Sequence, residues 1–175
     1  MSSNLESVFL NGTVGSGKTT VAAALQRLLI ADGVGNAVID LDDLRRSWPV
    51  PREDPFNNEL ELRNLRAVAS NYREAGVQRL ILAGVIEHPA DVERYRAALD
   101  GGTLTVIRLK PSLSAVHERL TKRDKADATD LSWYLRRGPE LNQILEDADF
   151  DEYVVPIADE PPSEVAVAVR VLLGW

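Results

Sequence analysis

The stretch Gly12-Thr13-Val14-Gly15-Ser16-Gly17-Lys18-Thr19 decides the fold. It follows the apolar run Val8-Phe9-Leu10 and precedes a helical pattern. Glycine tolerates backbone angles that let successive N–H groups turn inward toward an anion. A helix that begins at the end of such a loop adds the partial positive charge of its amino terminus. The spacing G-x-x-x-x-G-K-[ST] is met at every fixed position, so the stretch predicts a phosphate-binding loop between a strand and a helix.

The residues of this loop have separate expected roles. Lys18 can reach the β- and γ-phosphates of a nucleoside triphosphate, and the Thr19 hydroxyl can ligate Mg²⁺. Thr20 follows at the point where the α-phosphate would lie. ATP and Mg²⁺ are therefore the expected ligands. The expected nucleotide-binding residues are Gly12, Thr13, Val14, Gly15, Ser16, Gly17, Lys18, Thr19 and Thr20.

Apolar β-like runs alternate with helical patterns along the rest of the chain. The strands are expected around 8–10, 37–39, 79–83, 104–109 and 153–157. The helices are expected over 19–32, 59–75, 89–99, 111–123 and 131–146, the last of these broken at Gly138-Pro139, and then over a final helix capped by Ser163. Such alternation predicts an α/β protein with the three-layer P-loop NTPase fold, a five-stranded parallel sheet with helices on both faces. Ligands are expected where the strands end, at one edge of the sheet.

Length and composition fit one domain spanning residues 1–175, either monomeric or homodimeric. The chain is 45% hydrophobic and has a formal net charge of −7, which disfavours nucleic acid and anionic membranes as partners. It contains no cysteine, which excludes disulfides and zinc–thiolate sites. No apolar run approaches the roughly 18 residues that a membrane-spanning helix needs. The expectation is a cytoplasmic protein.

Acidic residues follow the second expected strand. Asp40 and Asp42 have the spacing that aims both side chains of an extended segment into one cleft. There they could hold Mg²⁺ through water and accept a proton from an attacking hydroxyl. Asp43 reads better as a helix-capping residue. Arg45 or the neighbouring Arg46 could hold an anionic acceptor.

The phosphate loop together with D-x-D-[DN]-L-R resembles the small P-loop kinases, and most of all adenylylsulfate kinase, where the corresponding stretch reads D-G-D-N-[LV]-R. The resemblance implies transfer of the γ-phosphoryl group of ATP to a hydroxyl of a small molecule. It implies that Asp42 is the acceptor-side acid, Asp40 its supporting partner and Arg45 a substrate-binding arginine. The family has a Phe-Ile-Ser-Pro-type motif after the third strand, where this chain has Gly84–Pro89. The resemblance therefore does not identify the acceptor.

Arginines close the helix that follows the fourth expected strand. In the nucleotide-kinase-like proteins, R-x-x-x-R at this place begins a mobile lid whose arginines stabilise charge on the transferred phosphoryl group. Arg119 and Arg123 match that spacing and share a helix face. They are taken as catalytic candidates in a lid within residues 119–140, with Arg136-Arg137 as a second edge. The alternative is a solvated basic helix end.

Three further features leave alternatives open. The third strand lacks a terminal acid, so Glu87 either assists there or begins the helix at Pro89. Arg63 is a substrate-binding candidate that could equally face solvent.

The alternative function is a nucleotide-binding regulatory ATPase or GTPase switch without an acceptor. Thr121–Asp124 matches the T-K-x-D guanine motif of GTPases but lies at a helix end instead of directly after a strand, so we interpret it as a chance match.

Overall fold

The computed structural model describes residues 5–123 and 128–175. Its centre is a parallel sheet with the strand order β2-β3-β1-β4-β5. The strands are β1 (Glu6–Asn11), β2 (Asn36–Asp40), β3 (Arg79–Ala83), β4 (Thr103–Pro111) and β5 (Tyr153–Ile157). The five-stranded parallel sheet predicted from the sequence is confirmed. Because all five strands run the same way, their carboxyl ends meet at one edge.

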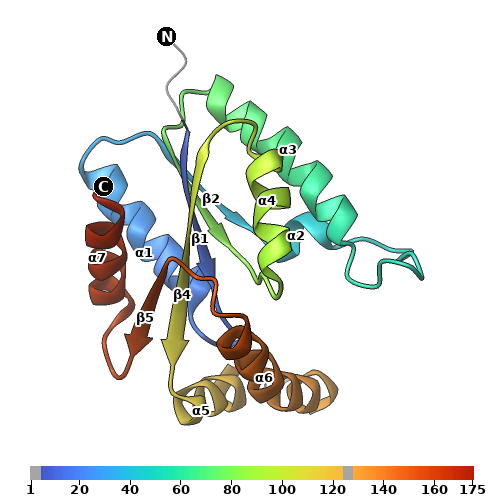
Figure 1. Ribbon diagram of the computed structural model, residues 1–175. Coiled ribbons are helices and arrows are strands. Elements are labelled where there is room, and N and C mark those ends of the chain that lie inside the picture. Colours follow the sequence, from blue (N-terminus) through green and yellow to red (C-terminus); the bar gives the residue numbers. More distant parts are fainter. Residues whose placement is uncertain (1–4, 124–127) are drawn as a thin grey trace.

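The helices cover both faces and the carboxyl edge. They are α1 (Lys18–Ala31), α2 (Leu41–Arg45), α3 (Asn58–Glu74), α4 (Pro89–Ala98), α5 (Leu113–Arg123), α6 (Ala128–Ala148) and α7 (Pro162–Leu173). Figure 1 shows α1 and α7 on one side of the sheet, α3 and α4 on the other, and α5 and α6 beyond the ends of β4 and β5. No helix among the described residues is long and apolar enough to span a membrane.

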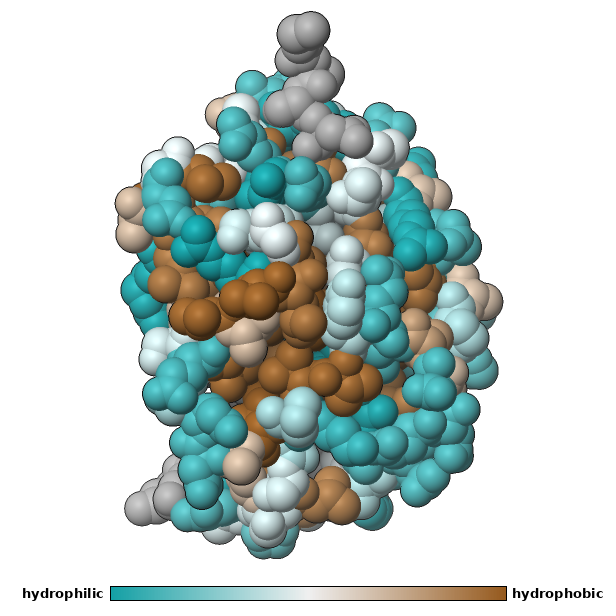
Figure 2. All heavy atoms as spheres, turned by 60° about the vertical axis from the view of Figure 1, so that its left-hand side comes forward, coloured by the Kyte–Doolittle hydropathy of each residue, from teal (hydrophilic) through white to brown (hydrophobic). Residues whose placement is uncertain are grey.

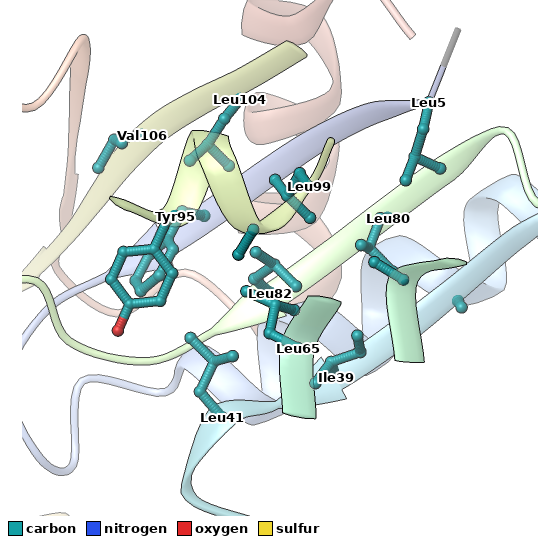
Figure 3. Close-up of a cluster of buried hydrophobic side chains, with 14 of the residues drawn as sticks. Leu5, Ile39, Leu41, Leu65, Leu80, Leu82, Tyr95, Leu99, Leu104 and Val106 are labelled. Carbon is teal, nitrogen blue, oxygen red and sulfur yellow. The ribbon is translucent and has the colours of Figure 1, made fainter. Parts of the chain in front are cut away.

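The core on the α3/α4 side joins the sheet to both helices. Leu65 of α3 and Leu82 of β3 are fully buried members of this core and are labelled in Figure 3. Phe9 of β1 is fully buried in the same core. Tyr95 of α4 packs edge-on against Phe9, with ring centroids 5.0 Å apart. Figure 3 shows the Tyr95 hydroxyl pointing away from the labelled apolar side chains. This tyrosine therefore connects the apolar core to a polar region at its border.

The opposite core lies between the sheet, α1 and α7. Leu10 of β1, Leu25 of α1 and Val169 of α7 are among its fully buried members. The outer surface on this side also carries apolar side chains, and Figure 2 shows them gathered on the face that bears α1 and α7. Ile30, Val167 and Val171 contribute to it, and Val171 is 73% exposed.

Two boundary predictions are wrong. The helix over 131–146 is not broken at Gly138-Pro139, because α6 continues through Pro139. Proline removes one backbone hydrogen bond, and the burial of Leu141 and Leu145 in the following turns offsets that loss. Ser163 does not cap α7. The helix begins at Pro162, whose fixed φ suits the first helical position, and Pro161 precedes it.

Candidate active site

The loop between β1 and α1 has the backbone that its glycines predict. Gly12, Gly15 and Gly17 all have positive φ angles, of 145°, 78° and 93°. A Cβ on Gly12 would also lie 2.8 Å from the main-chain oxygen of Leu109 in β4. The conformation therefore favours glycine at all three positions, and at Gly12 the close approach of a neighbouring strand requires it as well.

Lys18 reaches back across the loop. Its Nζ donates to the carbonyl oxygens of Gly12 and Thr13 at 2.9 and 2.8 Å. Burial lowers the pKa of Lys18 to about 8, although the carboxylates of Asp42 and Asp40 act in the opposite direction. The amine is thus held over the centre of the loop, in surroundings where a bound anion would strongly favour its protonated form.

Asn11 fixes the start of the loop. Its side chain is fully buried, and its Oδ1 accepts from the N–H groups of Gly12 and Ile86 at 2.9 and 3.1 Å. Its Nδ2 donates to the Ile86 carbonyl at 3.3 Å and to Asp151 Oδ1 at 2.9 Å. One side chain therefore ties the phosphate loop to the segment after β3. Sequence reasoning missed it, and the only signal was a polar residue closing an apolar run.

The two aspartates after β2 are linked to the loop. Thr19 Oγ1 donates to Asp40 Oδ2 at 2.9 Å, and Asp40 Oδ1 accepts from the N–H of Asp42 at 3.2 Å. The second bond caps the short helix α2, which carries Asp42 toward the cleft. Arg45, one turn later, donates to Asp42 Oδ1 from Nε at 2.9 Å and also from Nη2.

A buried carboxylate supports Arg45 from behind. Glu61 of α3 is only 1% exposed, and its Oε2 lies 3.3 Å from Arg45 Nε. Its Oε1 accepts from the Tyr95 hydroxyl at 2.5 Å. Burial raises the pKa of Glu61 and of Tyr95. Sequence reasoning missed both residues. The signal for Glu61 was a charged residue in line with the buried Leu65 and Ala69 of the same helix.

One cavity of about 860 Å³ brings most of the expected residues together. From the predicted set it is lined by Val14, Gly15, Gly17, Lys18, Thr19, Thr20, Asp40, Asp42, Arg45 and Arg119. Arg119 of α5 lies against the loop, since a Cβ on Gly17 would be 3.8 Å from its Nη1. Arg119 and Thr20 also line an adjoining hollow of about 290 Å³ that extends to Glu160 and Pro162, before and at the start of α7.

The remaining candidates are placed differently. Arg63 is exposed and is not among the residues that line the cavity. Arg123 ends α5, and its side chain lies outside the described residues, as do residues 124–127 of the expected lid. Glu87 does line the cavity, where it pairs with Arg137 of α6 at 2.6 Å.

A glycine-rich loop at the carboxyl edge of a parallel sheet, followed by a helix that begins with Lys18, defines the P-loop NTPase fold. The chain belongs to the AAA domain family, whose profile matches residues 8–143.

Two curated relatives point to the adenylylsulfate kinases. The bifunctional enzyme CysN/CysC of Rhodopirellula baltica is 34% identical over 131 residues, which are 71% of this chain and 20% of that protein. The adenylyl-sulfate kinase of Lactiplantibacillus plantarum is 29% identical over 125 residues, covering 69% and 58% of the two chains. This chain therefore spans less than two thirds of the length of either relative. The expected relation to small P-loop kinases of the adenylylsulfate kinase group is confirmed.

Solved structures show the same fold along nearly the whole chain. The Deinococcus radiodurans tunicamycin resistance protein has a TM-score of 0.69 at 24% identity, covering 97% of this chain and 96% of that one. The Mycobacterium tuberculosis APS kinase CysC in complex with AMPPNP and APS has a TM-score of 0.62 at 20% identity, covering 98% and 99%. Shikimate kinase from Acinetobacter baumannii has a TM-score of 0.59 at 19% identity, covering 98% and 95%.

Proposed function

We propose that the protein transfers the γ-phosphoryl group of ATP to a hydroxyl group of a small molecule. The observation that carries the proposal is the chain of contacts from Thr19 through Asp40 to Asp42, which faces the same cavity as Lys18. It places a carboxylate beside the phosphate loop, where a triphosphate binds. The relative described as an adenylyl-sulfate kinase supports the same reaction class.

The residues present suit Mg²⁺. The Thr19 hydroxyl and the Asp40 carboxylate supply oxygen ligands, which Mg²⁺ prefers, and both lie at the start of the nucleotide cavity. When bound there, the ion would neutralise charge on the β- and γ-phosphate oxygens. Lys18 and the inward-facing N–H groups of the loop would bind those phosphates. The adjoining hollow between Arg119, Thr20 and Pro162 is our candidate for the base of the nucleotide.

Asp42 is the proposed base. Both hydrogen bonds from Arg45 go to Oδ1, and among the described residues no donor is recorded to Oδ2. Arg45 thus holds the carboxylate in place while Oδ2 can accept a proton. In the transfer, the acceptor oxygen bonds to the γ-phosphorus, the bond from that phosphorus to ADP breaks, and the acceptor proton passes to Asp42. Arg119, lying against Gly17, would stabilise charge on the group in transit.

We also propose that residues 119–140 act as the lid and that the chain functions as one domain. A lid that closes over the cavity would exclude water during transfer. Arg137 of α6 supports this proposal, because it lines the cavity and pairs there with Glu87 from the segment after β3.

The test is an acceptor panel with ADP formation as the readout. Asp42→Asn is expected to lower kcat by about 10²–10⁴, which is the usual contribution of a positioned base. Its affinity for Mg·ATP should stay within a few-fold of the original. Asp43→Asn is the matched control, because Asp43 is the adjacent exposed carboxylate and pairs with Arg46 at 2.9 Å. Unchanged transfer in Asp42→Asn would rule out this role, and hydrolysis independent of every acceptor would favour a regulatory ATPase.

A further inference from the structure

The part of the cavity beyond Asp42, here called the acceptor chamber, has an unusual distribution of charge. It is bordered by α2, α3, α4 and the middle of α6. Four arginines line it: Arg45, Arg46, Arg94 and Arg137. If these arginines are free to bind a ligand, the chamber suits an anionic acceptor; if they are already paired, it does not. The inference concerns the acceptor and therefore rests on the proposed phosphotransfer.

Arg45 has two carboxylate partners within the protein. Asp42 receives hydrogen bonds from its Nε and Nη2, and Glu61 Oε2 lies 3.3 Å from Nε on the inner side. Glu61 is 1% exposed and is also held by the Tyr95 hydroxyl, so it cannot turn toward solvent to release Arg45. A ligand anion would have to compete with both acids.

The other three arginines are paired as well. Arg94 of α4 binds Glu59, and its Nη1 lies 3.3 Å from Asp91 Oδ1. Arg137 lies 2.6 Å from Glu87 and 3.1 Å from Glu140. Arg46 lies 2.9 Å from Asp43. The carboxylates around these four guanidinium groups are Asp42, Asp43, Glu59, Glu61, Glu87, Asp91 and Glu140.

Every arginine of the chamber is therefore paired with at least one carboxylate, and four of these acids, Asp42, Asp43, Glu87 and Asp91, line the chamber themselves. An anionic acceptor would have to separate an arginine from its carboxylate and leave that carboxylate unpaired. The chamber also offers apolar surface. Phe56 is 55% exposed and Trp133 42% exposed, and both line the cavity. Side chains of this kind pack well against the faces of a ring.

We propose that the acceptor is a hydroxyl compound without negative charge, either neutral or cationic, whose ring or apolar face packs against Phe56 and Trp133. This replaces the expectation that Arg45 or Arg46 holds an anionic acceptor. Both arginines serve instead to position Asp42 and Asp43.

The first experiment uses inorganic sulfate as the probe and does not require the acceptor. The phosphate loop is filled with a non-hydrolysable ATP analogue and Mg²⁺, and sulfate is titrated by calorimetry at constant ionic strength. The wild-type protein is expected to show no saturable binding in the low millimolar range. The double variant Glu59→Gln/Asp91→Asn, which changes two exposed side chains and frees Arg94, should gain it.

Two outcomes would overturn the proposal. One is saturable sulfate binding to the wild-type protein that is lost in Arg94→Gln or Arg137→Gln. The other is a double variant that still binds no sulfate, because the ion pairs would then not be what excludes anions.

The second experiment compares acceptors matched except for charge: a nucleoside with its monophosphate, and a sugar with its sugar acid and its amino sugar. The uncharged or cationic member is expected to have the higher kcat/KM by about tenfold or more. A preference for the anionic member would overturn the charge proposal and leave phosphotransfer standing. If Mg·ATP binds but no acceptor promotes ADP formation, phosphotransfer fails, and the sulfate titration still decides the charge of the chamber.

Discussion

At the scale of single residues, Lys18 shows how the loop prepares for an anion. Its ammonium group is largely removed from water and donates hydrogen bonds to two carbonyl oxygens instead. This burial lowers the pKa of Lys18 to about 8. A bound triphosphate would supply the missing negative charge and raise the pKa again. Proton uptake and nucleotide binding are therefore coupled at this one side chain.

This coupling predicts a pH dependence of binding. Affinity for Mg·ATP should be nearly constant below about pH 7, where the free protein already carries the proton on Lys18. It should then fall as the pH rises further, by up to about tenfold per unit, because binding must recover a lost proton. Calorimetry in buffers of different ionisation enthalpy would measure the proton uptake. Lys18→Gln should bind more weakly and without this slope, and a flat wild-type profile up to pH 9.5 would contradict the prediction.

The sequence could predict the residues of the phosphate loop. It could not predict that Glu61, held by Tyr95, would support Arg45. The motif fixes residues 12–19 because each position has its own backbone or ligand requirement. The Glu61–Tyr95 contact joins residues 34 positions apart, and no local pattern specifies such a pairing. Arg63 was expected near the acceptor. It lies two residues after the buried Glu61, about 200° around the helix, so it faces solvent.

At the scale of elements, the alternation of strands and helices was predictable because buried parallel strands are short apolar runs. The helix α2 was not, since five residues at the end of a strand give too little periodicity. Tertiary contacts also explain why α6 continues past Pro139. Buried Arg108 of β4 lies 3.1 Å from Glu146 Oε1 and donates to Asn142 Oδ1 at 3.1 Å, so the helix is held to the sheet beyond Pro139.

Asn11 provides a test of how elements are joined. Asn11→Ala removes four hydrogen bonds and leaves buried groups at Gly12 and Ile86 without their partner. We expect a loss of about 2–4 kcal/mol in the free energy of unfolding, because unsatisfied buried groups cost about 1–3 kcal/mol each. Urea denaturation would measure it. Asn36→Ala, which removes a single side-chain bond to Val34, is the control, and an equal loss in both variants would contradict the role of Asn11.

At the scale of the whole molecule, the strand order divides the cavity. With β1 in the middle of β2-β3-β1-β4-β5, the phosphate loop sits at the centre of the carboxyl edge. Asp42, Glu61 and Tyr95 come from helices on the β2–β3 side. Arg119 and the hollow beside α7 lie on the β4–β5 side. The proposed site of the nucleotide base therefore lies on the β4–β5 side, whereas α2 and α3 border the acceptor chamber from the β2–β3 side and α6 borders it from beyond β4 and β5.

This division predicts that nucleotide stabilises the fold independently of the acceptor half. A non-hydrolysable ATP analogue at about 100 times its Kd should add about 2.7 kcal/mol, which for a chain of this size raises Tm by roughly 5–10 °C. Asp42→Asn should keep that shift. Thr19→Ala should reduce the shift measured with Mg²⁺ to the value measured in EDTA, because Thr19 and Asp40 are the proposed ligands of the ion. Thermal unfolding of the wild-type protein, Asp42→Asn and Thr19→Ala, each with and without Mg²⁺, would measure these Tm shifts. If Asp42→Asn lost the whole shift, the two halves could not be separate, and Asp42 would have to be placed in the nucleotide site.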